Sequence, residues 1–215
     1  LICVLEVHDT TDSDSVSSLN AAVNYWKEMK SLLNQYSKYV IVNIANEWMA
    51  SWEMGADWQS GYINAVRSLR NAGITNVLMV DAPGYAQEVN AMYQYCRGVR
   101  DADTTGNIMF SIHMYADAGK DAATVKSGID AASQMGICLC IGEFGCAHGT
   151  RDVDEYTIMS HCKTRQVSYF AWSWYGNGSP VEYLDLVKDA TANPKLASYE
   201  DITIENWDGS KSWTA

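Results

Sequence analysis

The sequence predicts an α/β fold in which strands and helices alternate around a parallel sheet. Two observations predict it: short apolar runs that recur along the chain, and amphipathic helical patterns between them. The runs are continuously apolar rather than alternating, which is typical of strands buried on both faces of a parallel sheet. They begin roughly 30 to 37 residues apart, the length of one strand–helix unit.

Six apolar runs define the expected strands: Ile2–His8, Tyr39–Asn46, Asn76–Asp81, Ile108–Tyr115, Ile137–Phe144 and Ser168–Asn177. In the stretches between them, apolar residues recur every three or four positions, as on one face of a helix. The clearest helical patterns cover Ser17–Tyr36 and Trp58–Asn71, and Gly73 follows the second as a C-terminal stop. A last helix is expected to start at the acidic residues 152–155.

A repeated strand–helix unit of this length fits a (β/α)8 barrel or a doubly wound sheet. No glycine-rich phosphate-binding fingerprint follows any apolar run, which weighs against a nucleotide-binding doubly wound domain. We therefore expect a single domain over residues 1–215 with the α/β fold of a (β/α)8 TIM barrel. About six βα units are present, the first two are expected to be missing, and a polar tail is expected from about residue 187.

Composition narrows the class of function. The formal net charge of −11 argues against a nucleic-acid partner, whose binding site is usually basic. No apolar stretch reaches the roughly 18 to 20 residues of a membrane helix. Eight Trp and thirteen Tyr stand against three Phe, which indicates either rings with a polar edge toward a ligand or simply a Trp-rich core.

Metal and disulfide chemistry receive little support from the sequence. No two of the four histidines lie at helical ligand spacing, and the six cysteines lack zinc-finger spacing, so we expect no metal and no cofactor. Cys146 and Cys162 are candidates for a disulfide in an oxidising compartment, and the sequence leaves their connectivity open.

Each expected strand ends in a polar or aromatic side chain. A single such residue is more often a cap or a turn former, but here all six strands share the feature. In a (β/α)8 barrel the C-terminal strand ends meet at one mouth, where active sites lie. The residues are His8, Asn46, Glu47, Trp48, Asp81, His113, Tyr115, Glu143, Trp172 and Trp174.

Glu47 and Glu143 form the most informative pair. Two carboxyl groups at one barrel mouth suit the hydrolysis of a glycosidic bond, with one as general acid/base and the other as nucleophile. The simpler alternative is that each glutamate pairs with a basic residue at its strand end. The additional presence of His113, Tyr115 and the tryptophans favours the catalytic interpretation.

Four ordered motifs closely resemble glycoside hydrolase family 5. They are Asn46-Glu47, Ile112–Tyr115, Ile141–Gly145 and Ala171–Trp174. The details NEW, DAPGYAQ, FSIHMY and EYLDL are similar to the bacterial endo-β-1,4-mannanases of that family more than to its cellulases. The resemblance extends over nearly the whole chain.

The resemblance implies a retaining mechanism, in which Glu47 is the acid/base and Glu143 the nucleophile, with carboxyl groups about 5–5.5 Å apart. It implies that Asn46 binds the sugar 2-hydroxyl and that Tyr115 hydrogen-bonds Glu143. The remaining implied substrate contacts are His8 and His113 around the sugar whose bond is cleaved, Trp172 or Trp174 as its platform, and Trp48 and His148 as further cleft contacts.

The expected substrate is β-mannan or a manno-oligosaccharide, with no nucleic acid or membrane partner and a monomeric protein once complete. Because a polymer cannot enter a cell, we expect secretion. The family also uses an arginine on an early strand that has no counterpart here, and we do not expect these 215 residues alone to be active. Two alternatives stay open: an endo-β-1,4-glucanase of the same family, and a non-catalytic carbohydrate-binding barrel.

Overall fold

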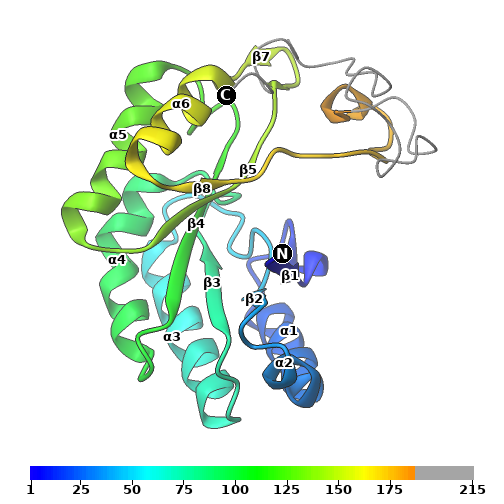
Figure 1. Ribbon diagram of the computed structural model, residues 1–215, viewed down its shortest axis with the longest axis vertical. Helices are drawn as coiled ribbons and strands as arrows, with labels where there is room; N and C mark the ends of the chain where they lie inside the picture. Colours follow the sequence, from blue (N-terminus) through cyan, green and yellow to red (C-terminus); the bar gives the residue numbers. More distant parts are fainter. Residues whose placement is uncertain (187–215) are drawn as a thin grey trace. The chain divides into compact units, whose positions relative to one another are not determined.

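The computed structural model describes residues 1–186, and Figure 1 shows the alternating strands and helices. The chain divides into two compact units. The first comprises Leu1–His113 and Asp130–Cys140, and the second comprises Met114–Ile129 and residues 141–186. The polar tail expected from about residue 187 lies outside the described residues.

The strands form one sheet in the order β1-β2-β3-β4-β5-β8. Neighbouring strands in the first unit pair in parallel from β1 to β4. Each strand therefore lies beside the next one along the chain, with a helix in between, and the prediction of a partial (β/α)8 barrel is confirmed. The bounds are β1 Cys3–Glu6, β2 Val40–Asn43, β3 Val77–Asp81, β4 Ile108–Met114, β5 Leu139–Phe144 and β8 Ser168–Tyr169.

Six α-helices connect these strands. They are α1 Val16–Glu28, α2 Lys30–Gln35, α3 Gly55–Asn71, α4 Val89–Ala102, α5 Ala122–Met135 and α6 Glu155–Arg165. Two short 3-10 helices, η1 His8–Thr10 and η2 Glu182–Leu184, and a two-stranded ladder of β6 Ala147–His148 and β7 Arg151–Asp152 complete the described chain. In the first unit, α3 contacts both α1 and α4.

Two elements differ clearly from the sequence prediction. The helix expected over Ser17–Tyr36 is two helices that meet at Met29. The last helix, in contrast, begins at Glu155 within the predicted range, and the Asp154 carboxylate caps it by accepting the Thr157 N–H at 3.0 Å.

The sixth strand is much shorter than the expected Ser168–Asn177. The Trp172 N–H still donates to the β5 residue Phe144 at 2.9 Å. From Ser173 the backbone bonds the end of η2 and the residues after it: the Ser173 N–H donates to the Leu184 carbonyl at 3.0 Å, and the Leu186 N–H donates to the Ser173 carbonyl at 2.9 Å.

Buried aromatic side chains donate hydrogen bonds to backbone carbonyls at or just beyond the strand ends. The Trp26 indole donates to the Ile44 carbonyl at 2.8 Å, and the Tyr62 hydroxyl donates to the Ala45 carbonyl at 3.0 Å. The Trp58 indole donates to the Asp81 carbonyl at 2.8 Å. Phe offers no such donor, so at these three positions Trp and Tyr serve the core rather than a ligand.

Two further expectations concern the described residues. None of the helices described in residues 1–186 has the length and apolar character required to span a bilayer. Cys146 and Cys162 are both free thiols, so the disulfide that the sequence left open is not formed.

Arg70 joins the beginnings of two strands at the end of the sheet opposite the strand-end residues. Its guanidinium bonds the Asp103 carboxylate at 2.7 Å and the carbonyls of Ile74, Asn76 and Asn107 at 2.8 to 2.9 Å. The Arg70 side chain is only 4% exposed. Burial raises the pKa of Asp103, but the hydrogen bonds from Arg70 and Thr105 outweigh it and lower the pKa overall.

We predict that Arg70→Met lowers the free energy of unfolding by about 3–5 kcal/mol, because it leaves a buried carboxylate and three carbonyls without their donor. Chemical denaturation followed by circular dichroism measures this change. The difference from wild type should narrow as the pH falls through the lowered pKa of Asp103, since protonation removes the charge that Arg70 stabilises.

Arg67→Met is the matched control, because Arg67 lies exposed on the same helix. A control loss as large as that of Arg70→Met would contradict this account.

Candidate active site

The segment after β2 places Glu47 above the end of the sheet in the first unit. β2 stops at Asn43, whose side-chain oxygen accepts the Ala45 N–H at 3.3 Å. Glu47 then adopts a left-handed backbone with φ of 48°. Its N–H donates to the Asp81 carboxylate at 3.0 Å, which fixes this turn to the end of β3.

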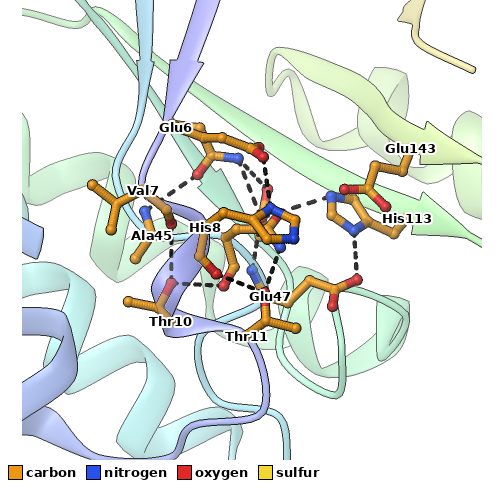
Figure 2. A network of polar contacts seen from close by, with 12 residues as sticks. Glu6, Val7, His8, Thr10, Thr11, Ala45, Glu47, His113 and Glu143 are labelled. Atoms are coloured by element: carbon orange, nitrogen blue, oxygen red, sulfur yellow. Dashed lines mark hydrogen bonds and ion pairs between the residues drawn. The ribbon is translucent and has the colours of Figure 1, made fainter. Parts of the chain in front are cut away.

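The Glu47 carboxyl meets the imidazole of His113 from β4. The distance from Glu47 Oε1 to His113 Nδ1 is 2.8 Å, as Figure 2 shows. The Glu47 side chain is 12% exposed, whereas His113 is buried, so the carboxyl has one open side. The Nδ1 of a neutral imidazole protonated on Nε2 accepts a hydrogen bond from a protonated carboxyl, and the Nδ1–H of an imidazolium donates one to a carboxylate. His113 therefore offers a partner to either protonation state of Glu47.

Asp81 lies behind this pair and is fully buried. Its Oδ2 is 3.7 Å from His113 Nε2, and the Asn43 amide donates to both carboxylate oxygens at 3.0 and 3.2 Å. Burial raises the pKa of Asp81, and the charge of His113 and the Glu47 N–H oppose that rise. A charged Asp81 favours a proton on Nε2, which sets the tautomer of His113.

Sequence reasoning noted Asp81 as a strand end but gave it no role in the site. An aspartate that ends a strand is commonly a cap, and its link to His113 is visible only in three dimensions. The one available signal was its shared position with Glu47 and His113 at the ends of adjacent strands.

His8 lies nearby in the first unit (Figure 2), and Asn46 directly precedes Glu47 in the chain. The Asn46 amide donates to the Thr11 hydroxyl at 2.8 Å, and the Thr10 hydroxyl donates to the Asn46 carbonyl at 2.7 Å. The side-chain oxygen of Asn46 is buried with no hydrogen-bond partner among the described residues. His8 is half exposed, and its Nδ1 lies 2.8 Å from Glu6 Oε1.

Trp48 does not reach a surface that a sugar can contact, so the predicted cleft contact is wrong. The side chain is fully buried, its indole donates to the Ser15 carbonyl at 2.9 Å, and its ring packs edge-on against Tyr62. A Cβ on Gly61 would lie 2.2 Å from the Trp48 ring, so the glycine makes room for it. The residue that follows Glu47 is aromatic because it anchors the turn in the core.

Glu143 occupies the end of β5 in the second unit. Tyr115 donates its hydroxyl to Glu143 Oε2 at 2.8 Å, and both side chains are buried. The exposed His148 lies beside Tyr115, with ring centroids 5.6 Å apart. A hydrogen bond donated to the charged form of a carboxyl group favours ionisation.

Trp172 lies three residues after β8 and beside the end of β5. Its N–H donates to the Phe144 carbonyl at 2.9 Å, and its indole donates to the Asn177 side chain at 3.0 Å. Asn177 is in turn bonded to the Asp185 carboxylate at 2.7 Å. Trp174 is exposed and Trp172 only partly so, which makes Trp172 the more firmly held of the two predicted platform residues.

Comparison with known proteins identifies the family. The profile described as "Cellulase (glycosyl hydrolase family 5)" matches residues 1–178. The chain belongs to glycosyl hydrolase family 5. It is 46% identical over 209 residues to the mannan endo-1,4-beta-mannosidase of Salipaludibacillus agaradhaerens, covering 97% of this chain and 67% of that protein. The family prediction made from the motifs is therefore confirmed.

Two further proteins extend the comparison. Beta-mannanase/endoglucanase A of Caldicellulosiruptor saccharolyticus is 40% identical over 197 residues, which cover 88% of this chain and 14% of that protein. The beta-mannanase of Thermomonospora fusca is 42% identical with a TM-score of 0.81, over 87% of this chain and 63% of the solved one. That enzyme has also been solved in complex with mannohexaose.

These relatives are named as glycosidases, which confirms the predicted class of protein. The chain spans about two thirds or less of the length of each relative described.

We predict that Asp81→Asn lowers kcat for glycoside hydrolysis by about 10- to 100-fold with little change in KM. The amide keeps the shape of Asp81 but not its charge, so the geometry of His113 and Glu47 loosens without loss of a substrate contact. Steady-state kinetics on the longest protein that the gene encodes measure this split.

Asp57→Asn is the control, because it makes the same chemical change at an exposed position in the first turn of α3. An Asp81→Asn variant with wild-type kcat would refute the assigned role.

Proposed function

We propose that this chain is part of a secreted, endo-acting enzyme that cleaves β-1,4-mannosidic bonds with retention of configuration. The observation that carries the proposal is the contrast between the two strand-end glutamates. Glu47 contacts an imidazole that can serve either of its protonation states, and Glu143 accepts a hydrogen bond from a phenol. Glu143, which accepts a hydrogen bond that favours its ionised form, suits the nucleophile. Glu47, whose neighbour tolerates its protonated form, suits the acid.

The reaction proceeds in two displacements. In the first, the Glu143 carboxylate attacks the anomeric carbon, the glycosidic C–O bond breaks, and Glu47 gives its proton to the leaving oxygen. In the second, water attacks the anomeric carbon of the glycosyl-enzyme, Glu47 takes a proton from that water, and Glu143 leaves as a carboxylate. This chemistry requires the two carboxyl groups to be about 5–5.5 Å apart.

The surroundings of each glutamate support its role. While Glu47 is the protonated acid, His113 Nδ1 accepts its hydrogen bond, and Asp81 beside Nε2 supports the tautomer in which Nδ1 can accept. The Tyr115 hydroxyl stabilises Glu143 as a carboxylate, the form in which it attacks and in which it leaves. The reaction needs no cofactor, because the two carboxyl groups transfer the proton and the glycosyl group themselves.

Several observations support mannan as the substrate. The relatives are named for mannan hydrolysis, and one similar enzyme was crystallised with mannohexaose. Mannose and glucose differ at the 2-hydroxyl, which we assign to the unpartnered side-chain oxygen of Asn46. Secretion follows from a polymeric substrate. A β-1,4-glucanase is the second candidate, because one relative carries both names.

We predict that azide distinguishes the two glutamates. Glu143→Ala should lose measurable hydrolysis of 2,4-dinitrophenyl β-mannobioside, and azide should restore turnover with an α-glycosyl azide product, because azide attacks the substrate directly. Glu47→Ala should lose about 10²- to 10⁴-fold on mannan, and azide should give the β-glycosyl azide by attacking the glycosyl-enzyme.

Proton NMR of the glycosyl azide products determines whether each is the α or the β anomer. Glu28→Ala, an exposed glutamate on α1, is the matched control and should behave as wild type. The same azide anomer from both variants would refute the assignment of roles.

We predict mannan hydrolysis by the longest protein that the gene encodes, with at most weak hydrolysis of carboxymethylcellulose. Reducing-sugar release measures both, and the 215-residue chain is assayed in parallel. Faster hydrolysis of carboxymethylcellulose than of mannan would be consistent with family 5 but would overturn the proposed substrate. Activity of the 215-residue chain that is lost in Glu143→Ala would show that six βα units suffice.

A further inference from the structure

Trp52 is an exposed aromatic side chain on the loop that carries Glu47. The loop joins β2 to α3, and Trp52 lies five positions after Glu47. Its side chain is 47% exposed, unlike Trp26, Trp48 and Trp58, which are buried in the first unit. A large exposed ring beside a catalytic loop suggests a contact surface for a ligand.

Gly84 supports one face of the Trp52 ring. A Cβ built on Gly84 would lie 3.1 and 3.2 Å from Cε2 and Cδ2 of Trp52. These two atoms form the bond shared by both indole rings, so such an approach is possible only over the ring face. The Gly84 backbone therefore covers one face of the indole, and the exposure of the side chain indicates that the opposite face is open to solvent.

Three hydrogen bonds from backbone N–H groups fix the loop that carries Trp52. The Ser51 N–H donates to the Asp14 carboxylate at 2.8 Å, and the Glu53 N–H donates to the Glu88 carboxylate at 3.0 Å. The Gly84 N–H donates to the Met49 carbonyl at 2.8 Å, which ties this loop to the one after β3. A ring fixed before its ligand arrives loses little conformational entropy on binding.

Tyr85 adds a second aromatic ring next to Gly84. It is 38% exposed and has a left-handed backbone with φ of 54°. Hydrogen bonding to Asp12, burial and the charges of Asp12, Glu47 and Asp14 raise the pKa of Tyr85. The His113 N–H donates to the carbonyl of the next residue, Ala86, at 2.9 Å, so the loop that carries Tyr85 lies beside the histidine that Glu47 contacts.

We propose that Trp52, Gly84 and Tyr85, here called the Trp52 shelf, bind a mannosyl unit on the leaving-group side of the cleaved bond. The proposal rests on the proposed function. Because Glu47 donates its proton to the leaving oxygen, the sugar attached to that oxygen lies against Glu47 and its loop. The open indole face stacks on the C–H face of a pyranose, and the exposed carboxylates of Asp12 and Asp14 accept hydroxyl groups at the rim.

The test is the pattern of bonds cleaved in mannopentaose labelled with ¹⁸O at the reducing end, read by mass spectrometry in the longest protein that the gene encodes. Trp52→Ala should lower kcat/KM by about 3- to 10-fold and shift cleavage toward the reducing end, so that fewer mannosyl units occupy the leaving side. Trp52→Phe should restore most of the wild-type pattern. Tyr39→Ala, an exposed aromatic at the start of β2, should leave it unchanged.

An unchanged cleavage pattern in Trp52→Ala, or an equal rate loss for every bond, would overturn the proposal, because a purely structural role slows all bonds alike. Thermal unfolding checks that the variant is folded. If it is not, Trp52→Leu keeps an apolar contact on Gly84 without an aromatic face and gives the same readout. Wild-type protein that leaves mannopentaose intact would instead show that the proposed function has failed, and the shelf with it.

Discussion

Three buried aromatic side chains donate hydrogen bonds to the carbonyls of Ile44, Ala45 and Asp81. These bonds stabilise the backbone beneath the part of the candidate site that lies in the first unit. Ile44 and Ala45 lie just beyond β2 and Asp81 ends β3, and a buried carbonyl without a donor costs about 1–3 kcal/mol. Trp26 from α1, and Tyr62 and Trp58 from α3, supply those donors. The irregular turn that carries Asn46 and Glu47 is therefore stable because the surrounding helices complete its hydrogen bonding.

This arrangement joins packing to chemistry. Trp48 anchors in the core the same turn that presents Glu47 to His113. The Asp81 carboxylate accepts a hydrogen bond from the Glu47 backbone N–H and lies close to the His113 imidazole. An isolated buried aspartate would destabilise the fold. Here its hydrogen bonds offset part of that penalty, and its charge orients the imidazole that faces Glu47.

The sequence was sufficient for the order of strands and helices, because continuous apolar runs and helical periodicity are local signals. It also predicted that Glu47, His113, Tyr115 and Glu143 lie at or just after strand ends, since strand-end positions and motif order are visible in one dimension. It was wrong about Trp48, because an aromatic residue beside a catalytic one looks the same whether it faces a ligand or the core. The side chain's direction depends on the left-handed backbone at Glu47 and on the space that Gly61 provides, and neither is encoded locally. The role of Asp81 and the support of Trp52 by Gly84 depend on contacts between separate loops, and so were equally hidden.

The left-handed backbone at Glu47 has an evolutionary consequence. A non-glycine residue in this conformation is destabilised by about 1 kcal/mol or more, whereas glycine, and to a lesser degree asparagine, adopts it readily. Glu143 lies on a regular strand and has no such conflict. In a lineage released from selection for the proposed hydrolysis, drift toward stability should therefore replace Glu47 before Glu143. A descendant that has become a pure binding protein should show glycine or asparagine at position 47 while glutamate persists at position 143.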